Sequence, residues 1–204
     1  MLKSLRRRDI LILGAFWIST ACVVGLLLLF FMLRAPPAEQ SGPTIELPSG
    51  DVTAKNLYNL AQAAAQAWAE DVQFVSVSAT WNHASVAQLE QPVEWVYRFY
   101  SPGLQRILFV IVTPEQEVVV RPHLAKIRRE LRIVDSDNWQ VDSPAAVSAW
   151  LNNGGLEWLQ QAADRVVSAQ LTQDLESNLP VWTISGLNPE TGESVVFTLD
   201  AAQP

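Results

Sequence analysis

The feature that most constrains this chain is a run of 24 consecutive uncharged residues, from Ile10 to Leu33. An α-helix rises about 1.5 Å per residue, so the run would form a helix roughly 36 Å long, which exceeds the hydrocarbon core of a bilayer at about 30 Å. The apolar region of a cleaved signal peptide usually has only about 7 to 15 residues. We therefore interpret residues 10–33 as a transmembrane helix in contact with the lipid bilayer.

The charges beside this helix predict its orientation. Arg6, Arg7 and Arg8 precede it, and the positive-inside rule keeps such an end in the cytoplasm. We expect a single-pass protein of the cell membrane, with residues 1–9 as a short cytoplasmic end and the rest beyond the helix outside the cytoplasm. Lipoprotein processing at Cys22 is disfavoured, because the membrane-depth sequence continues to Leu33.

Residues 34–50 are predicted to be an extended linker that separates the helix from a folded domain. They contain few hydrophobic residues and four prolines, Pro36, Pro37, Pro43 and Pro48, a composition typical of stiff spacers. The folded, extracytoplasmic domain is then expected to span residues 51–204.

This domain is strongly acidic. Residues 1–34 carry a net charge of +4 within a total of −7, which leaves −11 for residues 35–204. Such a charge repels phosphate backbones, so we exclude nucleic acid as the main partner. Cys22 is the only cysteine, so the domain has to be stabilised by burial rather than by disulfides.

Residues 51–204 show the patterns of an α+β domain in which helices pack on an antiparallel sheet. Apolar residues recur at three- and four-residue spacing over 53–69, typical of a helix, and alternate over 75–81, typical of a half-buried strand. Residues 82–91 are predicted to be a loop, and Ser143 is predicted to cap a helix. We predict further strands at 93–100, 106–113, 118–121, 166–171, 181–185 and 194–199, and further helices at 143–151 and 156–163.

The two halves of the domain resemble each other. A shift of 87 residues aligns their hairpins, with Trp95 on Trp182, Tyr97 on Ile184, Pro102 on Pro189 and Phe109 on Val196. Self-similarity at a fixed shift is typical of repeated units. We interpret residues 51–122 and 140–202 as two tandem helix-plus-hairpin units.

A family resemblance rests on three of these features. They are the Ala/Trp helix with Ala63, Ala64, Ala67 and Trp68 before Asp71, the hairpin led by a Trp, and the closing segment Val195–Ala201. In this pattern the domain resembles PepSY-type domains, which are small exported bacterial modules that often occur in tandem. The family's Asp-Ala is commonly followed by a turn with Gly, which is missing after Asp200 and Ala201. The resemblance implies a non-catalytic binding or inhibitory module.

The sequence contains no pattern of catalytic or metal chemistry. His83 and His123 have no companion at metal-ligand spacing and are predicted to be surface residues. Asp135 and Asp137 are predicted to form a turn, because Trp139 breaks a calcium-loop pattern. The serines lack a Gly-x-Ser-x-Gly elbow. We predict no cofactor, no metal and no enzymatic activity, and we expect five tryptophans to face a core: Trp68, Trp81, Trp95, Trp150 and Trp182.

The candidate binding site is the one basic cluster in the acidic domain. It contains Lys126, Arg128, Arg129 and Arg132, which would suit an anionic partner or lipid head groups. We expect a non-catalytic accessory or regulatory domain with a protein partner outside the cytoplasm. The alternatives are an exported hydrolase with a triad invisible in sequence and a structural subunit of a membrane complex, which small residues on one helix face would suit, namely Gly14, Ala21 and Gly25.

Overall fold

A seven-stranded antiparallel sheet dominates the computed structural model, which describes residues 52–91, 93–127 and 131–203. These residues belong to one compact unit, Ile45–Pro204. Among them, no helix has the length and apolar character needed to cross a membrane. The predicted cytoplasmic end 1–9, transmembrane helix 10–33 and linker 34–50 lie outside the described residues.

The sheet has the strand order β4-β3-β2-β1-β5-β6-β7. It consists of a first meander, β1 to β4, and a second meander, β5 to β7, which meet at its centre where β1 pairs with β5. Every neighbouring pair is antiparallel. This confirms the predicted α+β class. The strands are β1 (Gln73–Trp81), β2 (Trp95–Ser101), β3 (Arg106–Val112), β4 (Val118–Pro122), β5 (Val166–Gln173), β6 (Pro180–Leu187) and β7 (Ser194–Asp200).

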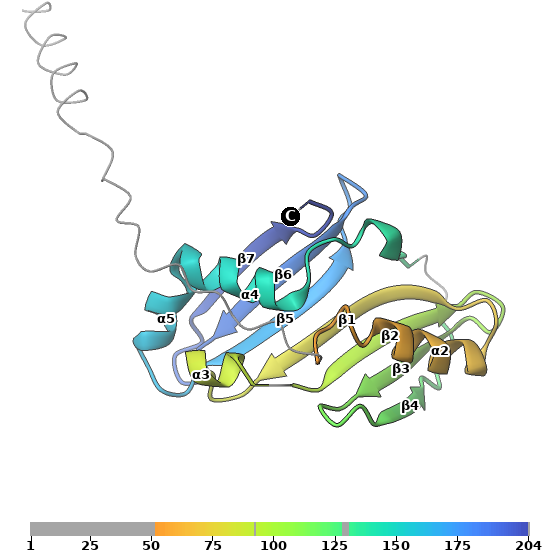
Figure 1. Cartoon of the computed structure of the whole chain (residues 1–204), viewed down its shortest axis with the longest axis horizontal. Coiled ribbons are helices and arrows are strands. Elements are labelled where there is room, and N and C mark those ends of the chain that lie inside the picture. Colours follow the sequence, from red (N-terminus) through yellow and green to blue (C-terminus); the bar gives the residue numbers. More distant parts are fainter. Residues whose placement is uncertain (1–51, 92, 128–130, 204) are drawn as a thin grey trace, which may run out of the picture. The chain divides into compact units, whose positions relative to one another are not determined.

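Helices pack on one face of the sheet. Helix α2 (Tyr58–Trp68) contacts β2, β3 and β4, and helix α4 (Ser143–Trp150) contacts β6 and β7, so both lie in front of the sheet in Figure 1. A distorted turn, Leu151–Gly155, joins α4 to the short helix α5 (Leu156–Gln160). We call the side with α2 and α4 the covered face and the opposite side the open face.

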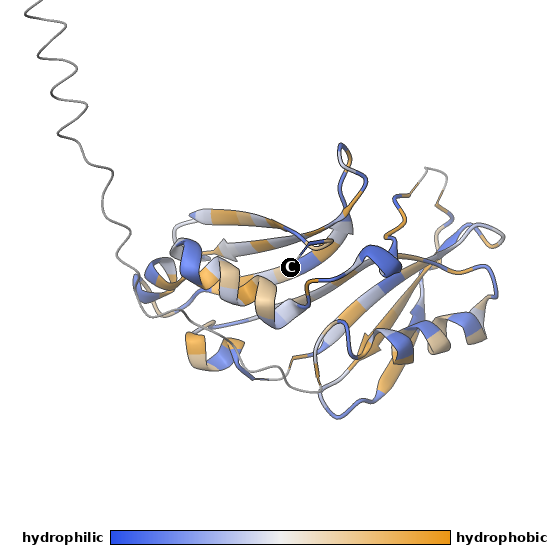
Figure 2. Cartoon of the chain, turned by 45° about the horizontal axis from the view of Figure 1, so that its top comes forward, coloured by the Kyte–Doolittle hydropathy of each residue, from blue (hydrophilic) through white to orange (hydrophobic). Residues whose placement is uncertain are grey.

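The strand residues alternate between these two faces, and the alternation of hydrophobic and hydrophilic residues can be followed along the strands in Figure 2. On the covered face, two rows of facing residues cross the sheet. One row contains the small residues Ala79 and Ala169 at the centre, and these leave room for Trp95 and Trp182, whose ring centroids lie 6.2 Å apart. Trp139 completes this aromatic core and donates its indole N–H to the Val141 carbonyl at 2.7 Å.

The prediction of core tryptophans is confirmed for four of the five residues. Trp81, Trp95, Trp150 and Trp182 are buried, whereas Trp68 at the end of α2 is only half-buried. Trp139 and Trp158 are buried as well, although the sequence pattern did not assign them to the core.

The shift of 87 residues aligns equivalent strands of the two meanders. Residues 95–101 of β2 fall on 182–188, which overlaps β6, and residues 106–112 of β3 fall on 193–199, which overlaps β7. The faces match too, because Phe109 and Val196 both lie on the open face. The strand β4 has no counterpart beyond β7 among the described residues.

Several local predictions are wrong. Residues 82–91 are not all loop, because Val86–Leu89 form helix α3 behind a Ser85 cap. Asp142, rather than Ser143, caps α4, because its carboxylate is already placed by Thr53 and accepts the Ser143 N–H at 2.6 Å. Leu60, one of the regularly spaced apolar residues of the helix predicted at 53–69, is exposed, because the buried stripe passes through the alanines at 61 and 65.

The first strand departs from strict alternation at one point. Its register with β2 shifts between Phe74 and Ser76, so that the intervening Val75 forms a bulge. Ser76 is consequently on the open face, although it is buried there by a neighbouring side chain. The other predicted strands coincide with the observed ones to within a few residues.

Candidate functional site

The predicted basic cluster is only partly within the described residues, because Arg128 and Arg129 lie outside them. Lys126 is exposed in a segment that runs beside β3, where the Ile127 N–H donates to the Gln105 carbonyl at 2.8 Å. Arg132 donates to the Gln173 carbonyl at the end of β5, at 3.4 Å. The two described cations thus lie outside the strands, one beside β3 and the other beside β5, at the same end of the sheet. A gathered site of all four residues stays a prediction.

A different arrangement of cations lies on the open face of the first meander. The strand register places Arg98, Phe109 and Arg121 in one row across β2, β3 and β4. Facing residues in an antiparallel pair project from the same side of the sheet. The row therefore has an aromatic ring at its centre and a guanidinium on each side.

Arg98 is held in place by its neighbours. Its guanidinium donates to the Ser76 hydroxyl at 3.1 Å, and its Cζ lies 5.9 Å from the centroid of the Phe109 ring. Burial lowers the pKa of Arg98 from its ordinary value, but a guanidinium stays charged at any physiological pH. A fixed cation is a better recognition element than a mobile one, because less side-chain entropy is lost on binding.

Hydrophobic and aromatic side chains surround this row. Val96, Ile111 and Val119 form the next row on one side, and Tyr100 and Ile107 form the next row on the other. His123 follows β4, and its ring meets the Phe109 ring edge-on at 6.3 Å between centroids. We call these nine residues the Phe109 surface: Val96, Arg98, Tyr100, Ile107, Phe109, Ile111, Val119, Arg121 and His123.

Residues 98–132 have a net charge opposite in sign to that of the rest of the domain. Residues 98–132 hold seven of the nine Lys and Arg residues that follow residue 34, with three Glu, for a net charge of +4. The remainder of residues 35–204 therefore carries −15. Within the described ranges, neither Arg98 nor Arg121 forms an ion pair.

The open face of the second meander has a different composition. Its rows contain small polar residues, such as Ser168 facing Ser185 and Thr183 facing Thr198. The Ser168 and Ser185 hydroxyls hydrogen-bond to each other at 2.7 Å. The combination of aromatic, aliphatic and cationic side chains is thus specific to β2, β3 and β4.

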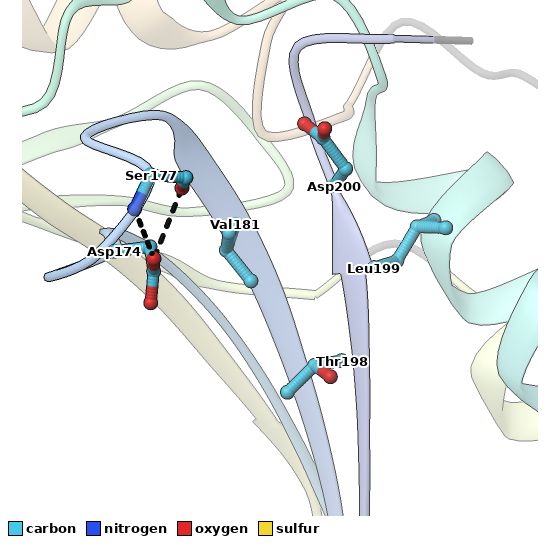
Figure 3. A pocket seen from close by; sticks show the side chains of 6 residues that line it. All are labelled: Asp174, Ser177, Val181, Thr198, Leu199 and Asp200. Carbon is cyan, nitrogen blue, oxygen red and sulfur yellow. Dashed lines mark hydrogen bonds between the residues drawn. The ribbon is translucent and has the colours of Figure 1, made fainter.

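A hollow of ≈ 260 Å³ lies at one end of the second meander, and its lining is drawn in Figure 3. The Asp174 carboxylate accepts the Ser177 N–H and hydroxyl, each at 2.9 Å, and these hydrogen bonds lower the pKa of Asp174. Asp200 accepts the Ala202 N–H at 2.8 Å. Both carboxylates and the Ser177 hydroxyl therefore stabilise their own turns, which leaves them poorly suited to activate a nucleophile.

The histidines lie on the surface, as predicted. His83 Nδ1 lies 2.8 Å from Asp164, and both side chains are exposed. His123 is exposed beside the Phe109 ring. Over residues 52–91, 93–127 and 131–203, no group of three His, Cys, Asp or Glu residues is placed to hold a metal ion.

No family model, no curated protein and no solved structure matches this chain. The resemblance to PepSY-type domains stays a prediction.

The Phe109 surface could not be predicted from the sequence. Strand β3 is hydrophobic at almost every position, so its pattern does not tell which side faces the helices. The signal that was available is the clustering of seven cations between residues 98 and 132. Placing Arg98 beside Phe109 and Arg121 required the strand register.

Proposed function

We propose that this chain is a single-pass membrane protein whose domain lies outside the cytoplasm and acts, without catalysis, as an accessory or regulatory subunit. In this proposal the domain binds a protein partner through the Phe109 surface. The observation that carries the proposal is the contrast between the two faces of the sheet. One face is buried under α2 and α4, and the other presents an aromatic ring between two cations without ion pairs in the described residues.

The chemistry of the surface specifies the kind of partner. Two guanidiniums beside aliphatic and aromatic side chains suit a segment that presents carboxylates next to apolar groups. Arginine and aromatic residues are the side chains most enriched in binding hot spots. Arginine also binds carboxylates through paired hydrogen bonds, which adds geometric specificity.

The membrane placement rests on the sequence. The uncharged run of residues 10–33 and the arginines that precede it support an anchor with the domain outside. Leu124 is 85% exposed, so a Leu124→Cys variant in a Cys22→Ser background should react with a membrane-impermeant maleimide on intact cells. Labelling only after the cells are lysed would contradict the placement.

The proposed domain contains two tandem helix-plus-sheet units. The overlap of β2 with β6 and of β3 with β7 under a single shift supports this division. In the part of the chain that the structure describes, only the first unit has a fourth strand and the cationic open face. In this proposal the first unit carries the binding surface and the second unit supports it through the shared core.

The binding proposal is tested by copurification of the full chain from crosslinked membranes. Arg121→Glu and Phe109→Ala should each lose the captured partner, whereas Thr183→Ala, on the same face of the other meander, should retain it. Once the partner is known, replacing its contacting carboxylate by Lys should restore binding to Arg121→Glu. Equal capture by all variants, or binding to vesicles of anionic phospholipid with no captured protein, would refute the proposed site.

A further inference from the structure

Within residues 52–91, 93–127 and 131–203, no strand pairs with the outer edge of β7. Proteins normally guard such edges with Lys, Pro, a bulge or an inward-pointing charge. The strand Ser194–Asp200 contains no Lys and no Pro, and its pairing with β6 is regular over seven consecutive positions. Val196, next to its middle residue, is 67% exposed.

The hydrogen bonds at both ends of β7 show which backbone groups point away from the sheet. The Asn188 N–H donates to the Glu193 carbonyl at 2.8 Å, and the Ala201 N–H donates to the Pro180 carbonyl at 2.9 Å. Bonded pairs alternate along an antiparallel ladder, so residues 195, 197 and 199 also bond to β6. The backbone groups of residues 194, 196, 198 and 200 therefore point outward.

In the first meander, β3 is the equivalent of β7, and it has a further strand, β4, paired on its outer side. In β3, the residues that bond to β4 are odd-numbered, since the His123 N–H donates to Ile107 at 2.7 Å and the Thr113 N–H donates to Glu117 at 3.0 Å. Adding 87 to residues 107, 109, 111 and 113 gives 194, 196, 198 and 200. The outward groups of β7 are thus the equivalents of those with which β3 binds a fourth strand.

The opposite edge of the sheet is guarded. In β4 the outward positions are 118, 120 and 122, by the same alternation, and position 122 is a proline without an N–H. Edge pairing is therefore more favourable at β7 than at β4.

We infer that β7 pairs with β7 of a second copy of this chain, which supplies the missing strand and makes one sheet of two domains. In the antiparallel register centred on Phe197, the outward residues 196 and 198 form bonded pairs, as do 194 and 200. The half-buried side chains Val195, Phe197 and Leu199 then meet their equivalents on the covered face. The strand is self-complementary, which is what a symmetric interface requires.

The charges of β7 are compatible with this register although the domain is acidic. Asp200 is the only charged residue in the strand, and it faces Ser194 of the second copy, whose hydroxyl can donate to it. The two Asp200 carboxylates are then six residues apart along the strand, roughly 20 Å. That distance exceeds the Debye length of about 8 Å at physiological ionic strength, so their repulsion is screened.

The test uses the full chain in membranes, with Cys22→Ser as the background because Cys22 is the only native cysteine. Chains with Val196→Cys and chains with Thr198→Cys carry different tags and are coexpressed, then oxidised. Position 196 of one copy and position 198 of the other form a bonded pair, whose Cα atoms are about 5.5 Å apart, within the range of a disulfide. Two residues at position 196, or two at position 198, lie on the longer diagonal. We expect the mixed disulfide to form several-fold more than either like pair.

Two edge variants separate this pairing from other contacts. Val196→Lys and Thr198→Pro should abolish the dimer measured by sedimentation. Each should leave the melting curve of the dilute, monomeric protein nearly unchanged, because neither removes a bond within the monomer. Val120→Lys on β4 is the matched control and should leave the dimer intact. A dimer that survives Val196→Lys and Thr198→Pro, a like pair that forms as readily as the mixed disulfide, or disulfides of position 196 only with another protein would each overturn the inference.

Discussion

Gly186 gives the sharpest test of the packing between α5 and the sheet. It lies on the covered face of β6, at the position that matches Phe99 in the first meander, and the Trp158 ring occupies the space above it. A Cβ there would lie 2.6 Å from Cη2 and Cζ3 of Trp158 and 2.9 Å from Cγ2 of Val195. The ring cannot easily turn away, because the Arg165 guanidinium stacks on it at 4.2 Å.

The magnitude follows from two opposing effects of Gly186→Ala. Overpacking of a core costs up to about 3 kcal/mol, and replacing a glycine inside a strand recovers about 1 kcal/mol of backbone entropy. We expect a net loss of about 2 kcal/mol in the free energy of unfolding, or roughly 4–8 °C in Tm for a domain of this size.

Denaturant unfolding followed by tryptophan fluorescence measures this loss, with Thr183→Ala on the open face of β6 as a control that should stay within about 0.5 kcal/mol. A double-mutant cycle makes the reasoning specific. Trp158→Leu should cost less in the Gly186→Ala background than alone, with a coupling of at least about 1 kcal/mol. Additive effects, or an unchanged stability of Gly186→Ala, would refute the close approach of Trp158.

Three further substitutions probe contacts that join distant parts of the domain. Asp142→Ala removes the cap of α4 and the acceptor of the Lys55 N–H at 3.0 Å, so urea unfolding should show a loss of about 1–3 kcal/mol. Tyr97→Phe leaves the buried Ala54 carbonyl without its 2.6 Å hydrogen bond and should cost about 1–3 kcal/mol, whereas an unchanged midpoint would speak against that bond. Hydrogen bonds from the Ser101 hydroxyl and the Gly103 N–H lower the pKa of Asp71 in the folded state. This carboxylate therefore stabilises the fold fully above its unfolded pKa of about 4. The stabilisation is lost as the pH falls through the lowered folded pKa. The free energy of unfolding, measured by urea denaturation at several pH values from 7 to 2, should therefore decrease less with falling pH for Asp71→Asn than for the unchanged chain.

The sequence predicted the strands well because their hydrophobic patterns and turns are local. The hairpin at residues 101–105 and the turn at 188–193 follow from turn residues beside alternating segments, and both are observed. The bulge at Val75 and the cap at Asp142 were missed because they depend on residues far along the chain, namely β2 for the bulge and Thr53 and Lys55 for the cap.

The Phe109 surface was missed for a related reason. Local pattern assigns a residue to a face only when the two faces of a strand differ in polarity, and β3 is hydrophobic on both. Arg98 and Arg121 are 23 positions apart in sequence, and only the pairing of three strands brings them to either side of Phe109. The basic cluster at residues 126–132 could be predicted because its members are close together in sequence.

The central claim is that a protein partner binds the open face of the first meander, and photocrosslinking in intact membranes tests it most directly. A photoreactive residue is introduced into the full chain at position 119, where Val119 is 39% exposed within the Phe109 surface, or at position 183 on the open face of the second meander. We predict a discrete protein adduct from position 119 that Arg121→Glu removes, and none from position 183. Equal adducts from both positions, or none from position 119 where established membrane complexes are captured, would contradict the account.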